Sequence, residues 1–198
     1  MANAHAPRGL IPVGTLNHGA YRGKIRTFLA TGATGAIYIG SPVTVGNTSG
    51  MFNGQRYSTV AGGFTTAGIV QGVCVAVIPT DRSSTTYRVT STDRLIMVDV
   101  DPYTIYEVQD NQATDAAALL GTEFGMVADL ASDAGSTVTG YSSIAVDGST
   151  ATATWTDHDV EILDIIQSPD NVLGAYAKYH VRLLNHHALG TTNTFAGN

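Results

Sequence analysis

Residues 94–109 read Arg-Leu-Ile-Met-Val-Asp-Val-Asp-Pro-Tyr-Thr-Ile-Tyr-Glu-Val-Gln, and they contain two strand-like runs separated by a proline. Leu95 to Val100 is a short run of β-branched and long apolar side chains, which predicts a strand buried on both faces. Asp101-Pro102 predicts a turn or bulge, because proline has no N–H to donate to a sheet. Tyr103 to Gln109 predicts a second strand. We expect this pair of strands to be the centre of the fold.

The rest of the chain has the same character, with short apolar or alternating runs separated by turn residues. This pattern predicts an all-β fold, a sandwich or barrel-like single domain. One short helix is expected over Thr114 to Leu120, capped by Thr114 or Asp115 and ended by Gly121. The clearest alternation runs from Ala175 to Leu183 and places Tyr176 on the outward face. Further strands are expected at residues 24–30, 36–39, 42–45, 68–79, 85–90, 126–130, 136–140, 143–146, 150–156 and 160–166.

The two ends of the chain are expected to lie outside this domain. Residues 1–20 contain two prolines, three glycines and no usable period, which predicts an extended N-terminal arm that becomes ordered on a partner. Residues 21–187 then form the β-rich domain, and residues 188–198 form a flexible C-terminal tail. We expect that deletion of residues 1–20 leaves a folded domain.

The composition indicates a protein that works through contact with other proteins. Charged residues make up 13% of the chain, about half the roughly 25% of ordinary soluble domains. The single Cys74 excludes an intrachain disulfide and is expected to be a buried, inert thiol. No apolar run approaches the ~20 residues that cross a bilayer, and residues 1–14 lack the apolar core of a secretory signal. We therefore expect no membrane association and synthesis in a reducing cytoplasm.

The charges are unevenly distributed along the sequence. Residues 1–80 contain five cations and no anion, whereas the remainder contains the other five cations and all 16 anions. Either the fold mixes the two segments, or the basic segment lies on an acidic neighbour, another copy or a different protein. Nucleic acid is a weaker candidate, because the net charge is −6 and no dense basic cluster interleaves with aromatic residues. The N-terminal cations are Arg8, Arg22, Lys24, Arg26 and Arg56.

No group of residues specifies a reaction. Asp99 and Asp101 share one face of a regular strand and could bind Ca²⁺ or Mg²⁺ with other carboxylates, but a turn at Pro102 explains them more simply. His186 and His187 are adjacent and point in opposite directions on an extended chain, which is poor ligand geometry. We expect no catalytic, cofactor or metal site, and hence no enzyme. A hydrolase that uses Asp99 and Asp101 ranks third among the hypotheses for the function, after the two given at the end of this section.

Three segments resemble one family. Met-Ala-Asn-Ala-His-Ala-Pro-Arg-Gly-Leu (1–10), Met-Val-Asp-Val-Asp-Pro-Tyr-Thr-Ile-Tyr-Glu-Val-Gln (97–109) and Pro-Asp-Asn-Val-Leu-Gly-Ala-Tyr-Ala-Lys-Tyr-His-Val-Arg-Leu-Leu-Asn-His-His (169–187) are similar to the head decoration, or cement, proteins of tailed bacteriophages. The resemblance covers both ends and the middle of the chain, and residues 40–90 and 120–160 carry little of it.

The resemblance implies a structural virion protein. Proteins of this family bind the outside of the icosahedral capsid as dimers or trimers, bridge neighbouring major capsid proteins and reinforce the head against DNA pressure. For this chain it implies a homo-oligomer on the capsid exterior. We expect Arg8, Arg22, Lys24 and Arg26 to contact the capsid or a neighbouring copy and Tyr176 to lie at a subunit contact. The alternative function is a virion-associated carbohydrate-binding β-sandwich module, which predicts a monomer and glycan-dependent binding.

Overall fold

The computed structural model describes residues 3–16, 20–31, 35–61, 69–112, 125–131, 134–155 and 158–189. Within these ranges the regular structure consists of strands and one short 3-10 turn, so the all-β prediction is confirmed. No helix in the described part of the chain has the length and apolar character to span a bilayer. The elements are β1 Ile11–Thr15, β2 Ile25–Ala30, β3 Pro42–Phe52, β4 Gln55–Ala61, β5 Val70–Val77, β6 Arg94–Asp99, β7 Thr104–Gln109, β8 Met126–Leu130, β9 Val146–Thr152, β10 Val160–Ile165, β11 Lys178–Leu183 and η1 His187–Leu189.

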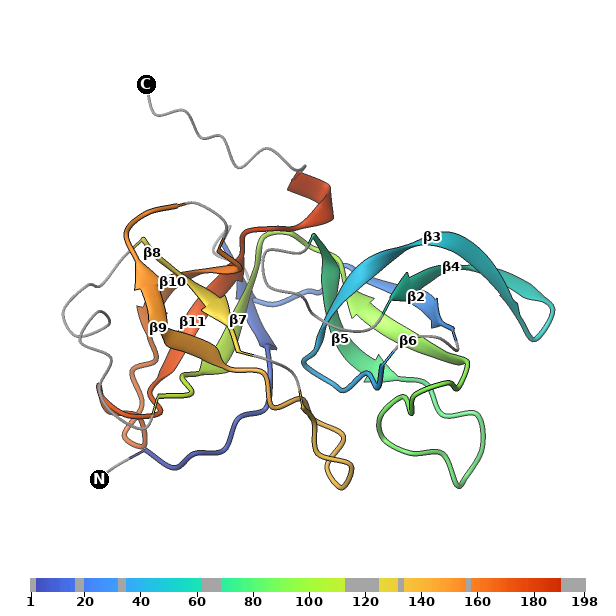
Figure 1. The fold of residues 1–198 in the computed structure, drawn as a ribbon, viewed down its shortest axis with the longest axis horizontal. Helices are drawn as coiled ribbons and strands as arrows, with labels where there is room; N and C mark the ends of the chain where they lie inside the picture. Colours follow the sequence, from blue (N-terminus) through green and yellow to red (C-terminus); the bar gives the residue numbers. More distant parts are fainter. Residues whose placement is uncertain are drawn as a thin grey trace.

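The strands form two units that lie side by side along the long axis of the molecule (Figure 1). One is a six-stranded sheet with the order β1-β7-β11-β10-β8-β9, and the other is a closed barrel with the order β2-β4-β3-β5-β6. Neighbouring strands are antiparallel except for the parallel pair β2 and β4. A barrel is therefore one half of the fold and a twisted sheet is the other.

The two central strands belong to different halves. β6 is a barrel strand and β7 is a sheet strand, so the chain passes from the barrel to the sheet at Asp101-Pro102. Both strands were predicted with nearly these bounds, because each carries a strong apolar pattern. Their separation into two sheets was not predicted, because the strand pattern does not reveal which strand each run pairs with.

β5 joins the two hydrophobic cores. Val70 and Val73 pack in the core of the sheet with Tyr106, whereas Cys74 packs in the core of the barrel. Burial raises the pKa of the Cys74 thiol to about 12, as expected for an inert thiol. One strand therefore contributes buried side chains to both cores.

Backbone hydrogen bonds from distant segments cross between the halves. The amide of Leu10 donates to the carbonyl of Gly40 at 3.0 Å, and the amide of Val70 donates to the carbonyl of Asn185 at 2.8 Å. Ile39 bonds with both Gly140 and Ser142, at 2.9 and 2.8 Å. Residues near the start, the middle and the end of the chain therefore hold the barrel against the sheet.

The N-terminal segment is extended, as predicted, but it packs on the chain's own sheet. β1 pairs with β7, and the side chain of Leu10 is completely buried. The expectation that this segment needs a partner for order is wrong for the described residues 3–16. The residues around Pro12 do not alternate between apolar and polar as in a typical strand. Pro12 nevertheless fits in β1, because β1 is an edge strand with a register shift between Pro12 and Gly14.

The strand expected at residues 42–45 continues to Phe52 and forms a long hairpin with β4. β3 and β4 pair up to Phe52 and Gln55, and the turn residues Asn53 and Gly54 have φ values of 49° and 78°. Positive φ at both positions is typical of a type I′ turn, for which Asn-Gly is a strong signal. The polar composition of the strands hid that signal, because glycine, serine and asparagine are more common in loops.

Several other strand predictions need correction. Residues 36–39 and 85–90 are not strands and contribute only isolated bridges, and residues 136–140 form a turn. Of the strand expected at residues 143–146 only Val146 is in a strand, because β9 occupies residues 146–152 rather than 150–156. Trp155, which lies within the predicted strand 150–156, follows β9 and is 40% exposed. The helix predicted over Thr114 to Leu120 lies outside the described residues. Of the predicted tail, residues 188 and 189 are part of η1 and the rest is likewise outside them.

Candidate functional site

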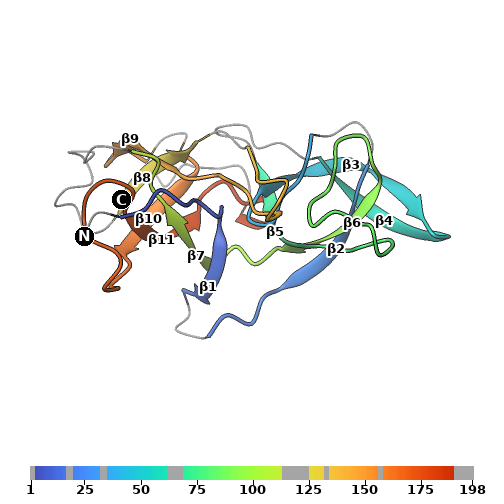
Figure 2. The same cartoon turned by 90° about the horizontal axis from the view of Figure 1, so that it is seen from below.

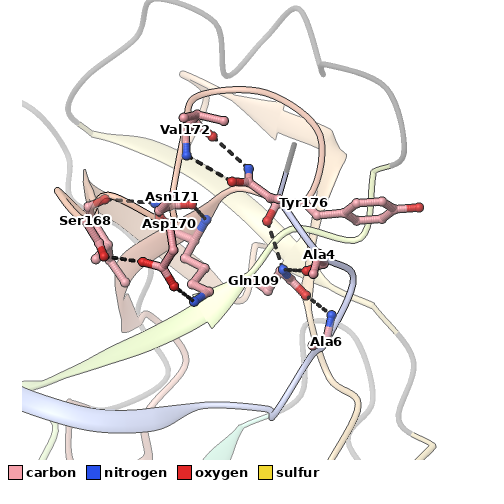
Figure 3. Close-up of polar contacts among 11 residues, drawn as sticks. Ala4, Ala6, Gln109, Ser168, Asp170, Asn171, Val172 and Tyr176 are labelled. Carbon is pink, nitrogen blue, oxygen red and sulfur yellow. Dashed lines mark hydrogen bonds and ion pairs between the residues drawn. The ribbon is translucent and has the colours of Figure 1, made fainter. Parts of the chain in front are cut away.

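The amide side chain of Gln109 fixes the N-terminal segment to the end of β7 (Figure 3). Its Nε2 donates to the carbonyls of Ala4 at 2.8 Å and Tyr176 at 2.9 Å, and its Oε1 accepts from the amide of Ala6 at 2.8 Å. Gln109 is 4% exposed, so these bonds are shielded from water. One buried amide therefore ties together three segments that are far apart in the sequence.

Asn3 extends this attachment toward the turn that precedes β11. Its Nδ2 donates to the carbonyls of Val172 and Ala175, both at 2.8 Å, and its Oδ1 accepts from the amide of Val172 at 2.9 Å. Asn171 fixes the same turn, because its side chain bonds with the backbone N–H and the carbonyl of Lys178. The N-terminal segment is thus hydrogen-bonded along its length before β1 begins.

A groove of about 690 Å³ lies between the N-terminal segment, β7 and the turn before β11. Its charged lining consists of Arg8, Glu107, Asp170 and Lys178. Lys178 Nζ lies 3.4 Å from Asp170, which also accepts a bond from the hydroxyl of Ser168. That hydroxyl, followed by the charge of Lys178, lowers the pKa of Asp170. Cations and anions alternate around the groove, so it has no preference for a ligand of one charge.

The structure separates the five predicted interface residues into two groups. Arg8 is exposed at the groove, and the ring of Tyr176 lies tilted against the ring of His5 in the N-terminal segment, with the ring centres 4.6 Å apart. Tyr176 precedes β11 and has φ 57°, so its predicted place on the outward face of the last strand is wrong. The second group, Arg22, Lys24 and Arg26, leads into β2 at the barrel.

The second group is a cationic run, residues 22–26, on the surface of the barrel. Arg22, Lys24 and Arg26 are all exposed, and so is Ile25 between them at 42%. Within the ranges that the structure describes, none of the three cations forms an ion pair. Their charges are therefore available to a partner. Arg22 and Lys24 precede β2 and Arg26 lies in it, and β2 is on the lower side of the barrel in Figure 2.

The carboxylates considered as a metal site serve the turn between β6 and β7. Asp99 is completely buried and accepts bonds from the hydroxyl of Thr104 at 2.8 Å and the amide of Asp101 at 3.2 Å. Asp101 accepts from the amide of Tyr103 at 3.0 Å, as in an Asx turn. In the described ranges, no group of three or more metal-binding side chains is close enough to hold an ion.

The adjacent histidines differ in their surroundings. His186 is completely buried, and its Nδ1 accepts from the amide of Ala188 at 3.1 Å. Burial lowers the pKa of His186, so the ring is neutral near pH 7. His187 is exposed at the start of η1. The pair therefore does not converge on a common ligand.

Sequence reasoning missed the residues that fix the N-terminal segment. Gln109 ends a predicted strand and Asn171 lies in a predicted loop, and nothing in the local sequence distinguishes either from a solvated amide. Their partners are 67 to 105 residues away or lie across a turn. Comparison of the chain with protein-family models, with curated proteins and with solved structures finds no match. A function therefore has to be argued from the residues and geometry of this chain.

Proposed function

We propose that the chain is a structural virion protein that binds the outer surface of a bacteriophage head and bridges major capsid proteins. The observation that carries this proposal is the exposed cationic run, in which Arg22, Lys24 and Arg26 have no ion-pair partner among the described residues. Exposed, unpaired charges attract an oppositely charged surface and orient its approach. The resemblance of three segments to head decoration proteins supports the capsid as that surface.

Three further features are consistent with a load-bearing role. The two cores share β5, and the halves are cross-linked by backbone hydrogen bonds. Gln109 holds the N-terminal segment in place, so this segment transmits force to β7 instead of moving freely. The low content of charge, 13%, leaves a surface that loses little solvation when another protein covers it.

The proposal includes self-association as a homo-dimer or homo-trimer on the capsid. Each single contact needs only modest affinity, because a bridging oligomer engages several capsid proteins at once and the second contact forms at a high effective concentration. Tyr176, which is half-buried and in contact with the ring of His5, stays the predicted residue at the subunit contact.

Co-sedimentation with purified heads that lack the protein tests the proposal. We expect the wild-type chain to bind at a stoichiometry comparable to the capsid protein. Replacement of Arg22, Lys24 and Arg26 by alanine is expected to weaken binding at least about tenfold, equivalent to about 1.4 kcal/mol. Added salt is expected to weaken wild-type binding more than binding of this variant, because salt screens exposed charges.

Arg56→Ala is the matched control, because Arg56 is an exposed cation on the β3–β4 hairpin and bonds only with Ser49 among the described residues. Circular dichroism verifies that each variant is folded. Deletion of residues 1–20 is not a suitable test, contrary to the expectation above, because it removes β1 and the buried Leu10. Failure of the wild-type chain to bind heads contradicts the proposal, and binding abolished by free sugars favours the carbohydrate-binding alternative.

A further inference from the structure

The first half of β2 has an open edge. β6 pairs with β2 along its whole length, from Ile25 to Ala30. β4 pairs with its other edge only at Leu29 and Ala30. Among the described residues, no strand pairs with this second edge before Leu29, and Figure 2 shows β2 on the lower side of the barrel.

The register identifies the backbone groups that face the open edge. The amide of Val100 donates to the carbonyl of Lys24 at 2.9 Å, which continues the β2–β6 register by one pair. In an antiparallel ladder every second residue bonds to the same neighbour, so Arg26 and Phe28 also bond to β6. The N–H and C=O groups of Ile25 and Thr27 therefore point to the opposite side, which is the open edge.

The neighbouring strand gives the same assignment independently. The amide of Ile78 donates to the carbonyl of Leu95 at 2.9 Å, so Leu95 and every second residue of β6 face β5. The remaining β6 residues, including Ile96 and Val98, face β2 and are in register with Phe28 and Arg26. Both registers therefore leave the backbone N–H and C=O groups of Ile25 and Thr27 without a hydrogen bond to β6.

The charges beside this edge specify the occupant. Lys24 and Arg26 are two residues apart, so both project from the same face of the strand, and both are exposed. Antiparallel pairing of β2 with β2 of a second copy would place these cations opposite or diagonal to cations, which is unfavourable. A strand with carboxylates at every second residue would instead oppose each cation with an anion.

We propose that the open edge of β2 binds an extended acidic segment of a partner protein by strand addition. The backbone of that segment bonds with Ile25 and Thr27, and its alternating carboxylates pair with Lys24 and Arg26. Identification of the partner as the capsid protein rests on the function proposed above. The contact is short and therefore weak by itself, which suits a shell that repeats it many times.

Hydrogen exchange measured by NMR tests strand addition directly. The probe is an acetylated and amidated peptide, Thr-Glu-Val-Glu-Thr-Glu-Thr, and the control peptide has glutamine in place of each glutamate. In the free protein we expect fast exchange at the amide of Thr27 and slow exchange at Arg26 and Phe28. The glutamate peptide is expected to slow exchange at Ile25 and Thr27. Unchanged exchange at both amides, or equal protection by the glutamine peptide, overturns the proposal.

Thr27→Pro removes the N–H at the open edge. The hydrogen bonds between the neighbouring residues and β6 stay in place, because proline is tolerated where its missing N–H would face an unpaired edge. We expect peptide binding to weaken at least about tenfold, whereas Thr27→Val, which keeps the N–H, binds as the wild type does. Unweakened peptide binding by a folded Thr27→Pro variant overturns the proposal.

Hydrogen exchange of the protein in the presence of purified heads distinguishes this proposal from the decoration role. Wild-type protein that binds heads without protection at Ile25 and Thr27 rules out strand addition on the capsid and leaves the decoration role intact. Protein that binds the glutamate peptide with protection but does not bind heads supports the acidic-strand site and rules out the decoration role.

Discussion

The hydroxyl of Thr104 donates a 2.8 Å hydrogen bond to Oδ2 of Asp99, so the first residue of β7 and the last residue of β6 hold each other across the turn between sheet and barrel. Both side chains are buried. The hydroxyl of Tyr106 lies 3.5 Å from the same oxygen, and burial followed by the charge of Asp99 raises the pKa of Tyr106 well above its usual value. A carboxylate in this position stabilises the junction only while its donors remain.

Thr104→Val tests that relationship. Valine has the shape of threonine but leaves Oδ2 of a buried carboxylate with a weaker set of donors, which is expected to lower the free energy of unfolding by roughly 1–3 kcal/mol. Urea titration at neutral pH measures the change. Thr104→Ser keeps the hydroxyl and should lose less stability than Thr104→Val. A serine variant that is less stable than the valine variant would contradict the role given to this bond.

Gly72→Ala tests the contact between β5 and β6. A Cβ at Gly72 would lie 1.9 Å from the carbonyl oxygen of Asp99, and the φ of Gly72 is 152°, which L-residues rarely adopt. We expect a loss of at least about 3 kcal/mol, because overpacking and backbone strain add. Gly54→Ala is the control, since Gly54 has φ 78° but open space around it. Equal melting temperatures for the two variants would disprove the close contact.

Gln109→Leu tests the attachment of the N-terminal segment. The variant loses the bonds to Ala4, Ala6 and Tyr176, so residues 3–8 should become accessible to proteases while the barrel remains folded. Limited proteolysis followed by mass spectrometry detects this change. Gln167→Leu replaces an exposed glutamine and is the control, which the protease should cleave in the same way as the wild type. An N-terminal segment in Gln109→Leu that resists cleavage as in the wild type would show that Gln109 does not hold it.

His186 should make stability depend on pH. Burial lowers its pKa from the ordinary value of 6.5, an effect that Asp99 opposes and His187 reinforces. Because the unfolded chain then takes up a proton more readily than the folded chain, this contribution is complete above pH 6.5 and is lost as the pH falls below it.

Urea titration of the wild type and His186→Gln between about pH 7.5 and about pH 5 measures this effect. The wild type should lose stability relative to the variant on acidification. His180→Gln removes a partly exposed histidine and serves as the control. A constant difference between wild type and His186→Gln across this range would contradict the prediction.

The all-β class and the central strand pair could be predicted because they depend on local patterns. Leu95 to Val100 and Tyr103 to Gln109 are apolar or alternating runs, and an extended chain with such side chains has to bury them in a sheet. The alternation of β11 was also correct, with Tyr179, Val181 and Leu183 buried. The hairpin at Asn53-Gly54 was missed because its polar strands gave no apolar signal.

The candidate sites were only partly visible in the sequence. The uneven distribution of charge identified Arg22, Lys24 and Arg26, and the structure places all three on the surface without ion pairs in its described ranges. The open edge of β2 could not be predicted, because it depends on where β4 begins to pair. The same holds for Gln109, whose partners come from both ends of the chain.

Sequence by itself determined that this chain folds into strands, that the first 80 residues carry cations without anions and that Cys74 is buried, because side-chain periodicity and composition act within a few residues. Only the tertiary structure decided that β6 and β7 belong to separate halves, that the N-terminal segment is held by Gln109, and that β2 keeps one edge open. Strand pairing brings together residues far apart in the chain, and no local pattern encodes which of the possible partners forms the better packed core.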